Sequence, residues 1–100
     1  MAYSIGVWRQ PRTTVYRWES DYGGAVKHEG FVRVYPDTMT VRPCTQNGTS
    51  IGDLTLGVDG GRTGSAQGVD PNLLRQIALA ILRKIGSTGE LPETAHKYYG

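Results

Sequence analysis

The sequence has one cysteine, no long apolar run and little net charge, and each shortage argues against a class of protein. Cys44 has no second cysteine for an internal disulfide, which is typical of a reducing compartment. The longest strongly apolar stretch, IALAIL at 77–82, is too short to span a bilayer. The formal net charge of +2 argues against strong non-specific binding to a polyanion. The start MAYSIGVW also lacks the pattern of a signal peptide, so we expect a cytoplasmic protein without membrane contact.

Motifs for metals, cofactors and catalysis are missing as well. The sequence contains no C-x-x-C and no H-x-x-x-H spacing for a metal. The glycine-rich stretch 57–69 holds no lysine and does not match the phosphate-binding P-loop. No nucleophile motif surrounds Cys44, His28 or His96, so a catalytic Cys–His pair would require a pocket that brings them together. We therefore expect no cofactor, no metal and no enzyme activity.

What the sequence does contain is a series of β-forming segments in its first half. They are rich in β-branched and aromatic residues and are separated by turns with proline, glycine, asparagine or aspartate. Short turns between consecutive strands predict an antiparallel meander. We expect four or five strands, drawn from the segments 4–9, 13–19, 25–29, 31–35, 39–44 and 51–58.

The second half contains one strongly periodic helix. Asp70 is a suitable N-cap, Pro71 suits the first helical position, and Gly86 suits the position after the last turn. Apolar residues recur between them at steps of three and four, at Leu73, Leu74, Ile77, Ala78, Ile81, Leu82 and Ile85. The resulting prediction is a single α+β domain over residues 1–86, with the helix packed across one face of the sheet. Residues 87–100 are expected to form a loosely packed or disordered tail, and 57–69 a long loop that is either mobile or functional.

One leucine does not fit the apolar stripe of this helix. Leu79 falls on the polar side, between Arg75 and Arg83. A leucine flanked by arginines suggests a small interface, since arginine is enriched at interfaces. The leading prediction is therefore a non-enzymatic protein-binding module that binds a protein partner, or a second copy of itself, through these three residues.

The alternative prediction is single-stranded nucleic-acid binding on the sheet. Aromatic residues and arginines alternate along the predicted strands, and arginine can contact phosphates while aromatic rings stack on bases. Acidic residues lie among these arginines and weaken the positive field. The candidate residues, expected together beside aromatic rings on the open face of the sheet, are Arg9, Arg17, Arg33 and Arg42.

In its overall character the chain resembles the small accessory proteins of actinobacterial bacteriophages. The resemblance lies in a length of 100 residues, a compact domain with a polar tail, and the lack of a catalytic signature. It attaches to no particular residue and transfers no site. It implies a viral protein that acts by binding in the host cytoplasm, with a host protein as a candidate partner.

Overall fold

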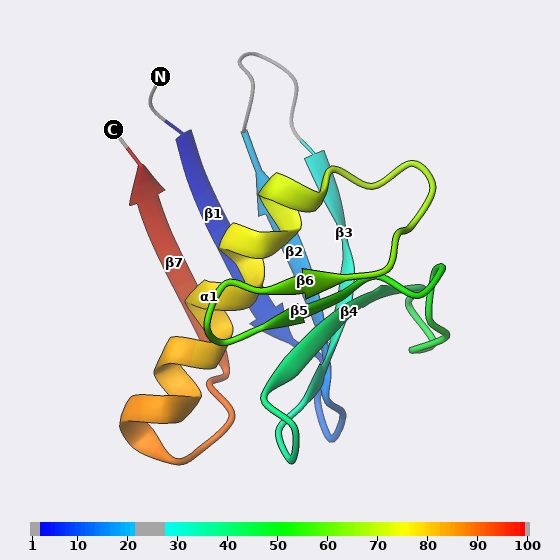
Figure 1. Cartoon of the computed structure of the whole chain (residues 1–100). Helices are drawn as coiled ribbons and strands as arrows, with labels where there is room; N and C mark the ends of the chain where they lie inside the picture. The colour runs from blue at the N-terminus through cyan, green and yellow to red at the C-terminus, as the bar shows by residue number, and fades with distance from the viewer. Residues whose placement is uncertain (1–2, 22–27, 100) are drawn as a thin grey trace.

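In the described part of the computed structural model, seven antiparallel strands form one sheet, and a single helix lies across one face of it (Figure 1). The structure describes residues 3–21 and 28–99. The α+β class, the antiparallel pairing and the single helix are confirmed, whereas the sheet is larger than the four or five strands expected. In chain order the elements are β1 (Tyr3–Arg9), β2 (Val15–Ser20), β3 (His28–Tyr35), β4 (Thr40–Cys44), β5 (Thr55–Gly57), β6 (Arg62–Thr63), α1 (Pro71–Thr88) and β7 (Thr94–Tyr99).

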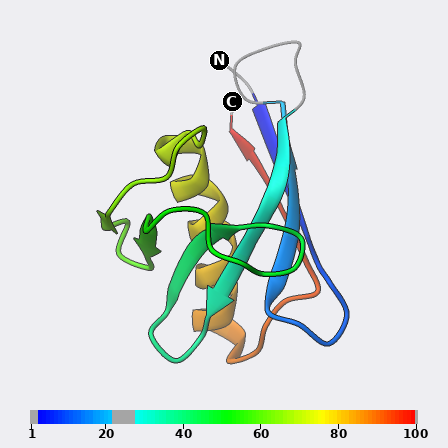
Figure 2. The same cartoon turned by 90° about the vertical axis from the view of Figure 1, so that its right-hand side faces the viewer.

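The strand order combines a meander with one late addition. Across the sheet the strands run β6-β5-β4-β3-β2-β1-β7, so the first six strands pair with their neighbours in sequence. The chain then passes through α1 and returns to the opposite edge, where β7 pairs with β1 from Tyr3↔Tyr99 to Trp8↔Thr94. Figure 2 shows the helix on one side of this sheet, and we call the other side the open face.

Of the segment expected to be a loose tail, residues 87–88 end α1 and residues 94–99 form β7 of the sheet. Among the β7 side chains whose burial the structure describes, residues 94–98, only Ala95 is both apolar and buried, at 3% exposed. β7 is held in place largely through its backbone pairing with β1, and backbone pairing leaves little trace in the side-chain pattern. The expectation of a tail was wrong for residues 94–99 for this reason.

The helix begins as expected and ends later. The Asp70 carboxylate accepts hydrogen bonds from the backbone N–H groups of Asn72 and Leu73, at 2.9 and 3.4 Å. At the other end Gly89, with a φ of 76°, takes the left-handed position and donates its N–H to the Ile85 carbonyl at 2.7 Å. The predicted stop at Gly86 was wrong because that residue stays helical. No helix in the described part of the chain is long and apolar enough to cross a membrane.

Two further elements differ from the prediction. The strand expected over 51–58 shortens to β5, and the glycine-rich stretch after it folds back as the two-residue β6. A tight turn joins them, in which Gly57 donates its N–H to the Gly61 carbonyl at 2.9 Å. Of the short strand expected over 25–29, residues 25–27 lie outside the described part of the chain, and 28–29 begin β3.

The core fills the space between α1 and the sheet. Alternate residues of each long strand point toward the helix, and the predicted apolar stripe of the helix faces them. The main strand contributors are Ile5, Val7, Tyr16, Trp18, Val32, Val34 and Val41; the helix contributes Leu73, Leu74, Ile77, Ala78, Ile81, Leu82 and Ile85.

Candidate functional site

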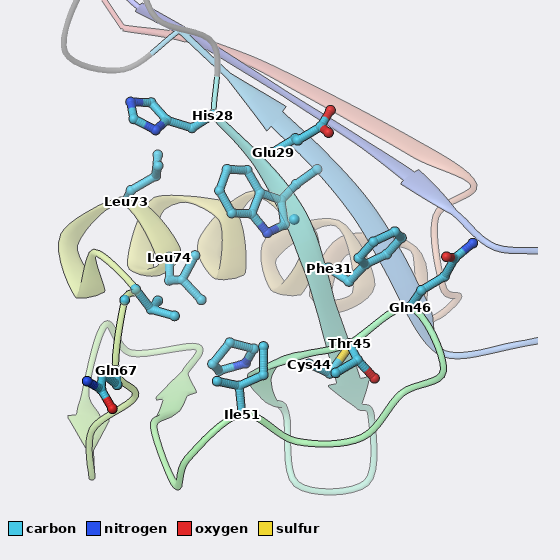
Figure 3. A pocket seen from close by; sticks show the side chains of 15 residues that line it. His28, Glu29, Phe31, Cys44, Thr45, Gln46, Ile51, Gln67, Leu73 and Leu74 are labelled. Carbon is cyan, nitrogen blue, oxygen red and sulfur yellow. The ribbon is translucent and has the colours of Figure 1, made fainter.

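A hollow with apolar walls opens at the margin of the sheet, where β4 ends (Figure 3). Its cavity volume is about 540 Å³, within the roughly 300–1,000 Å³ that ligand sites occupy. The walls come from β2, β3, the segment after β4, and the first turns of α1 with the residues before it. We call this hollow the apolar pocket; its main apolar side chains are Trp18, Phe31, Ile51, Val69, Leu73 and Leu74.

The pocket exists because β4 is shorter than β3. Pairing between these strands stops at Phe31↔Cys44, while β3 extends three residues further, to His28. The chain turns away after Cys44 and returns at Ile51, whose N–H donates to the Pro43 carbonyl at 3.0 Å. Beyond that point β3 has no β4 neighbour, and the space beside it is the pocket.

The backbone of Glu29 faces this gap. In an antiparallel sheet, successive residues direct their backbone groups alternately to the two neighbouring strands. The Val34 N–H donates to the Thr14 carbonyl at 2.8 Å, so even-numbered residues of β3 bond toward β2. The N–H and C=O of Glu29 therefore point to the β4 side, past the end of β4. The pocket thus combines apolar walls with one exposed position of a strand edge.

Polar side chains surround the apolar walls. Figure 3 shows His28 and Glu29 at one end of the pocket, Gln46 at another and Gln67 on the side of the segment that leads into α1. All four residues are exposed. An apolar interior with a polar rim is the arrangement that binds an apolar group and orients what surrounds it.

Cys44 and His28 both line this pocket, the arrangement on which a catalytic pair would depend. They are well apart in it (Figure 3). His28 lies three residues along β3 from Phe31, the strand partner of Cys44, a separation of about 10 Å. Burial raises the pKa of the Cys44 thiol to about 11, and the positive charge of Arg33 offsets this only in part. The thiol is therefore protonated near neutral pH, so the geometry supplies no activated nucleophile.

The four arginines of the nucleic-acid prediction do not form one surface. Arg17, Arg33 and Arg42 alternate with core residues and so project from the open face. Arg9 is paired with the core residue Tyr16 in the β1–β2 register, so its side chain leaves the backbone on the helix side of the sheet. The prediction that all four share one face is wrong for Arg9.

The three arginines on the open face differ in their partners. Arg17 is 5.5 Å from the centroid of the Trp8 ring and forms ion pairs with Glu19 and with Glu29, the latter at 3.3 Å. Arg33 and Arg42 face each other across β3 and β4, and their guanidinium groups lie 5.6 and 5.9 Å from the centroid of the Tyr35 ring. Arg17 is thus neutralised by carboxylates, whereas the other two share an aromatic neighbour.

The central residue of the predicted interface on α1, Leu79, is buried and so is not available to a partner. Leu79 is 7% exposed, because β7 packs against α1 and covers this side of the helix. Arg75 and Arg83 are exposed as expected, but the guanidinium of Arg75 lies against Gly60 in the β5–β6 turn. The helical periodicity placed Leu79 correctly relative to the stripe; the missing information was that residues 94–99 provide a second surface.

The apolar pocket was not predicted from the sequence. Its residues come from segments that are far apart in the chain, and Trp18, Leu73 and Leu74 are indistinguishable from ordinary core residues by pattern alone. The one local signal is Pro43 near the end of a strand, since proline is confined to positions that need no ladder hydrogen bond.

Groups of three or more side chains suited to hold a metal ion are absent from the residues that the structure describes. Comparisons of the chain with protein-family models, with curated proteins and with solved structures find no match.

Proposed function

We propose that the protein is a non-catalytic binding module whose apolar pocket accepts an aliphatic or aromatic side chain from a protein partner. The observation that carries this proposal is the pocket itself, with apolar walls of Trp18, Phe31, Ile51, Leu73 and Leu74 and a volume of about 540 Å³. This retains a protein partner, as the sequence suggested, and moves its binding surface from the side of α1 to the start of α1 and the end of β4.

The walls of the pocket suit an anchor residue. Leu73 and Leu74 are 3% and 1% exposed, so the helix forms a firm floor. Ile51, at 36% exposed, is the apolar residue most open to an incoming group. Most binding energy at protein interfaces comes from a few large side chains buried in such well-packed hollows.

The strand edge beside the pocket favours an extended segment of the partner. Glu29 presents its backbone N–H and C=O where β4 has ended, and an extended peptide can pair with these groups. Side chains alternate along an extended segment, so one can enter the pocket while its neighbours meet the polar rim of Glu29 and Gln46. A compact small molecule would leave this backbone position unused.

The proposal is tested with peptides selected from a random library for binding to the purified protein. We expect the selected peptides to share one large apolar residue and to bind by fluorescence anisotropy. Ile51→Asp places a charge at the mouth of the pocket and should weaken binding about tenfold or more, because burying an unpaired charge is costly.

Val58→Asp is the matched control. Val58 is 42% exposed, close to Ile51 in size and exposure, but it lies outside the pocket. The Val58→Asp variant should bind the peptides like the unmodified protein, and circular dichroism should show that both variants are folded. Equal binding by the unmodified protein and Ile51→Asp, or equal losses in the two variants, would overturn the proposal.

A further inference from the structure

A second hollow lies at the hairpin that joins β1 and β2. Three arginines line it, Arg9, Arg12 and Arg33, and its cavity volume is about 420 Å³. Thr13, Thr14, Val15 and Asn47 complete the lining. We call it the basic hollow. It shares no lining residue with the apolar pocket, so a ligand in the basic hollow is independent of the function proposed above.

Two of the three guanidinium groups are held in place by neighbouring backbone. Arg9 donates from Nε to the Thr13 carbonyl at 2.8 Å. Arg33 donates from Nη1 to the Gly48 carbonyl at 3.4 Å and lies over the ring of Tyr35. Arginines fixed in this way lose less conformational entropy when they bind a ligand than free side chains do.

The loop beside the hairpin is fixed as well. The side-chain amide of Gln10 donates to the Gln46 carbonyl at 3.1 Å, which ties the 45–49 loop to the hairpin. Within that loop Thr45 donates its N–H to the Thr49 carbonyl at 2.9 Å. Asn47 is therefore brought beside the arginines and adds a neutral amide to the lining.

Positive charge in the basic hollow is poorly balanced. Among the described residues, Arg9 and Arg17 are the only basic side chains that form ion pairs with carboxylates. Arg9 has a single carboxylate, that of Glu93, at 3.2 Å, and the Glu93 side chain is 75% exposed, so solvent weakens this pair. Arg12 and Arg33 have no carboxylate partner in the part of the chain that the structure describes.

A like charge also faces Arg33 within the sheet. Arg33 and Arg42 are directly opposite each other across β3 and β4. Like charges at opposed positions of a sheet are unfavourable, and a bound anion would relieve the repulsion. This repulsion favours the binding of an anion beside Arg33.

We infer that the basic hollow binds a phosphate group through Arg9, Arg12 and Arg33. The guanidinium fork matches the oxygens of phosphate, and hydrogen bonds between charged partners are the strongest class. The phosphate belongs either to a single-stranded nucleic acid, whose bases would have Tyr35 nearby, or to a free phosphate compound. The chemistry of recognition is the same in both cases.

The test compares two double variants that remove the same charge. Arg12→Gln with Arg33→Gln removes two arginines of the hollow; Arg62→Gln with Arg83→Gln removes two exposed arginines elsewhere. Pyrophosphate and a single-stranded oligonucleotide are titrated into each protein by calorimetry at low salt. The first variant should bind the preferred probe about tenfold or more weakly, and the second should bind it within about threefold of the unmodified protein.

The outcomes separate the source of the phosphate. A nucleic acid is supported if the oligonucleotide binds, if pyrophosphate displaces it, and if its affinity falls steeply as the salt concentration rises. Binding of pyrophosphate without binding of the oligonucleotide supports a free phosphate compound. The inference is overturned if neither probe binds, or if the two double variants lose affinity equally, since that would reflect net charge alone. Circular dichroism confirms that both variants fold, and neither result bears on the peptides of the apolar pocket.

Discussion

The two halves of β3 line hollows of opposite chemistry. Its first residues, 28–31, border the apolar pocket, whereas Arg33, two residues beyond Phe31, lines the basic hollow. The difference arises from what lies beside the strand. Beside residues 28–30, β4 has ended and the start of α1 supplies leucines; beside Arg33, β4 is present, and the hairpin and the 45–49 loop adjoin the open face. Two hollows of different chemistry therefore adjoin one strand.

The two sites also differ in how deeply they depend on the core. Leu74 belongs both to the apolar pocket and to the buried cluster under the sheet, so changes in the pocket reach the stability of the fold. Arg12 and Arg33 are exposed and contribute little to the core. Stability and binding should separate cleanly in the basic hollow and remain coupled in the apolar pocket.

The largest expected effect concerns the fold that carries both hollows. A chain ending at Pro92 lacks β7, so β1 loses its outer neighbour and Leu79 loses its cover. We expect this truncated chain to lose cooperative unfolding, because a paired strand and part of the core are missing together. Thermal unfolding followed by circular dichroism measures this. Tyr98→Ser, at a side chain 87% exposed, should unfold like the unmodified protein; a truncated chain that unfolds cooperatively at the original temperature would contradict the role of β7.

A smaller change should separate the two hollows. Leu74→Ala should lower the free energy of unfolding by about 2–5 kcal/mol, because it leaves a cavity beside the core. Leu74→Ala should also weaken the binding of the selected peptides, whereas the binding of pyrophosphate should stay unchanged. Urea unfolding and the two titrations measure these effects, with Val58→Ala as a control expected to stay within about 0.5 kcal/mol. A loss of pyrophosphate binding in Leu74→Ala would show that the hollows are not independent.

The smallest effect concerns alkaline pH. Burial raises the pKa of Cys44, at the apolar pocket, from 9.0 to about 11. Burial likewise raises the pKa of Tyr16, whose hydroxyl donates to the Pro92 carbonyl, from 10.0 to about 12; Arg9 opposes this shift and Glu93 adds to it. Between about pH 9 and pH 12 the unfolded chain therefore holds fewer protons than the folded one, and the free energy of unfolding should fall as pH rises.

Cys44→Ala separates the two groups. This variant should lose the part of the decline that begins near pH 9 and keep the part due to Tyr16, which begins near pH 10. Urea unfolding at a series of alkaline pH values measures both curves. Stability that stays constant across this range would show that neither group keeps its proton through burial.

The sequence predicted the parts of the fold that have local signals. The cap at Asp70, the proline at the first helical position and the apolar stripe from Leu73 to Ile85 together located α1, and alternating segments located most strands. What failed had no local signal. β7 is an edge strand held by backbone pairing, and its absence from the prediction made Leu79 look exposed. Two glycines three residues apart, Gly86 and Gly89, both suited the end of the helix, and only the backbone geometry distinguishes them.

The candidate sites were less predictable than the fold, for the same reason. Arg33 was identified, but Arg12 and Asn47 become its neighbours only through the hairpin and the loop that Gln10 ties to it. The apolar pocket depends on the early end of β4, which no single segment reveals. Sites made from several distant segments require the strand register before they can be recognised.

The most direct measurement is a nuclear magnetic resonance titration of the labelled protein with a selected peptide and, separately, with pyrophosphate. We predict that the peptide shifts the resonances of Gly30, Ile51 and the Trp18 indole, and that pyrophosphate shifts those of Arg12, Asn47 and Arg33 instead. Peptide shifts that map to the side of α1 around Arg83, or that leave Ile51 and Trp18 unmoved, would contradict the assignment of the apolar pocket as the binding site.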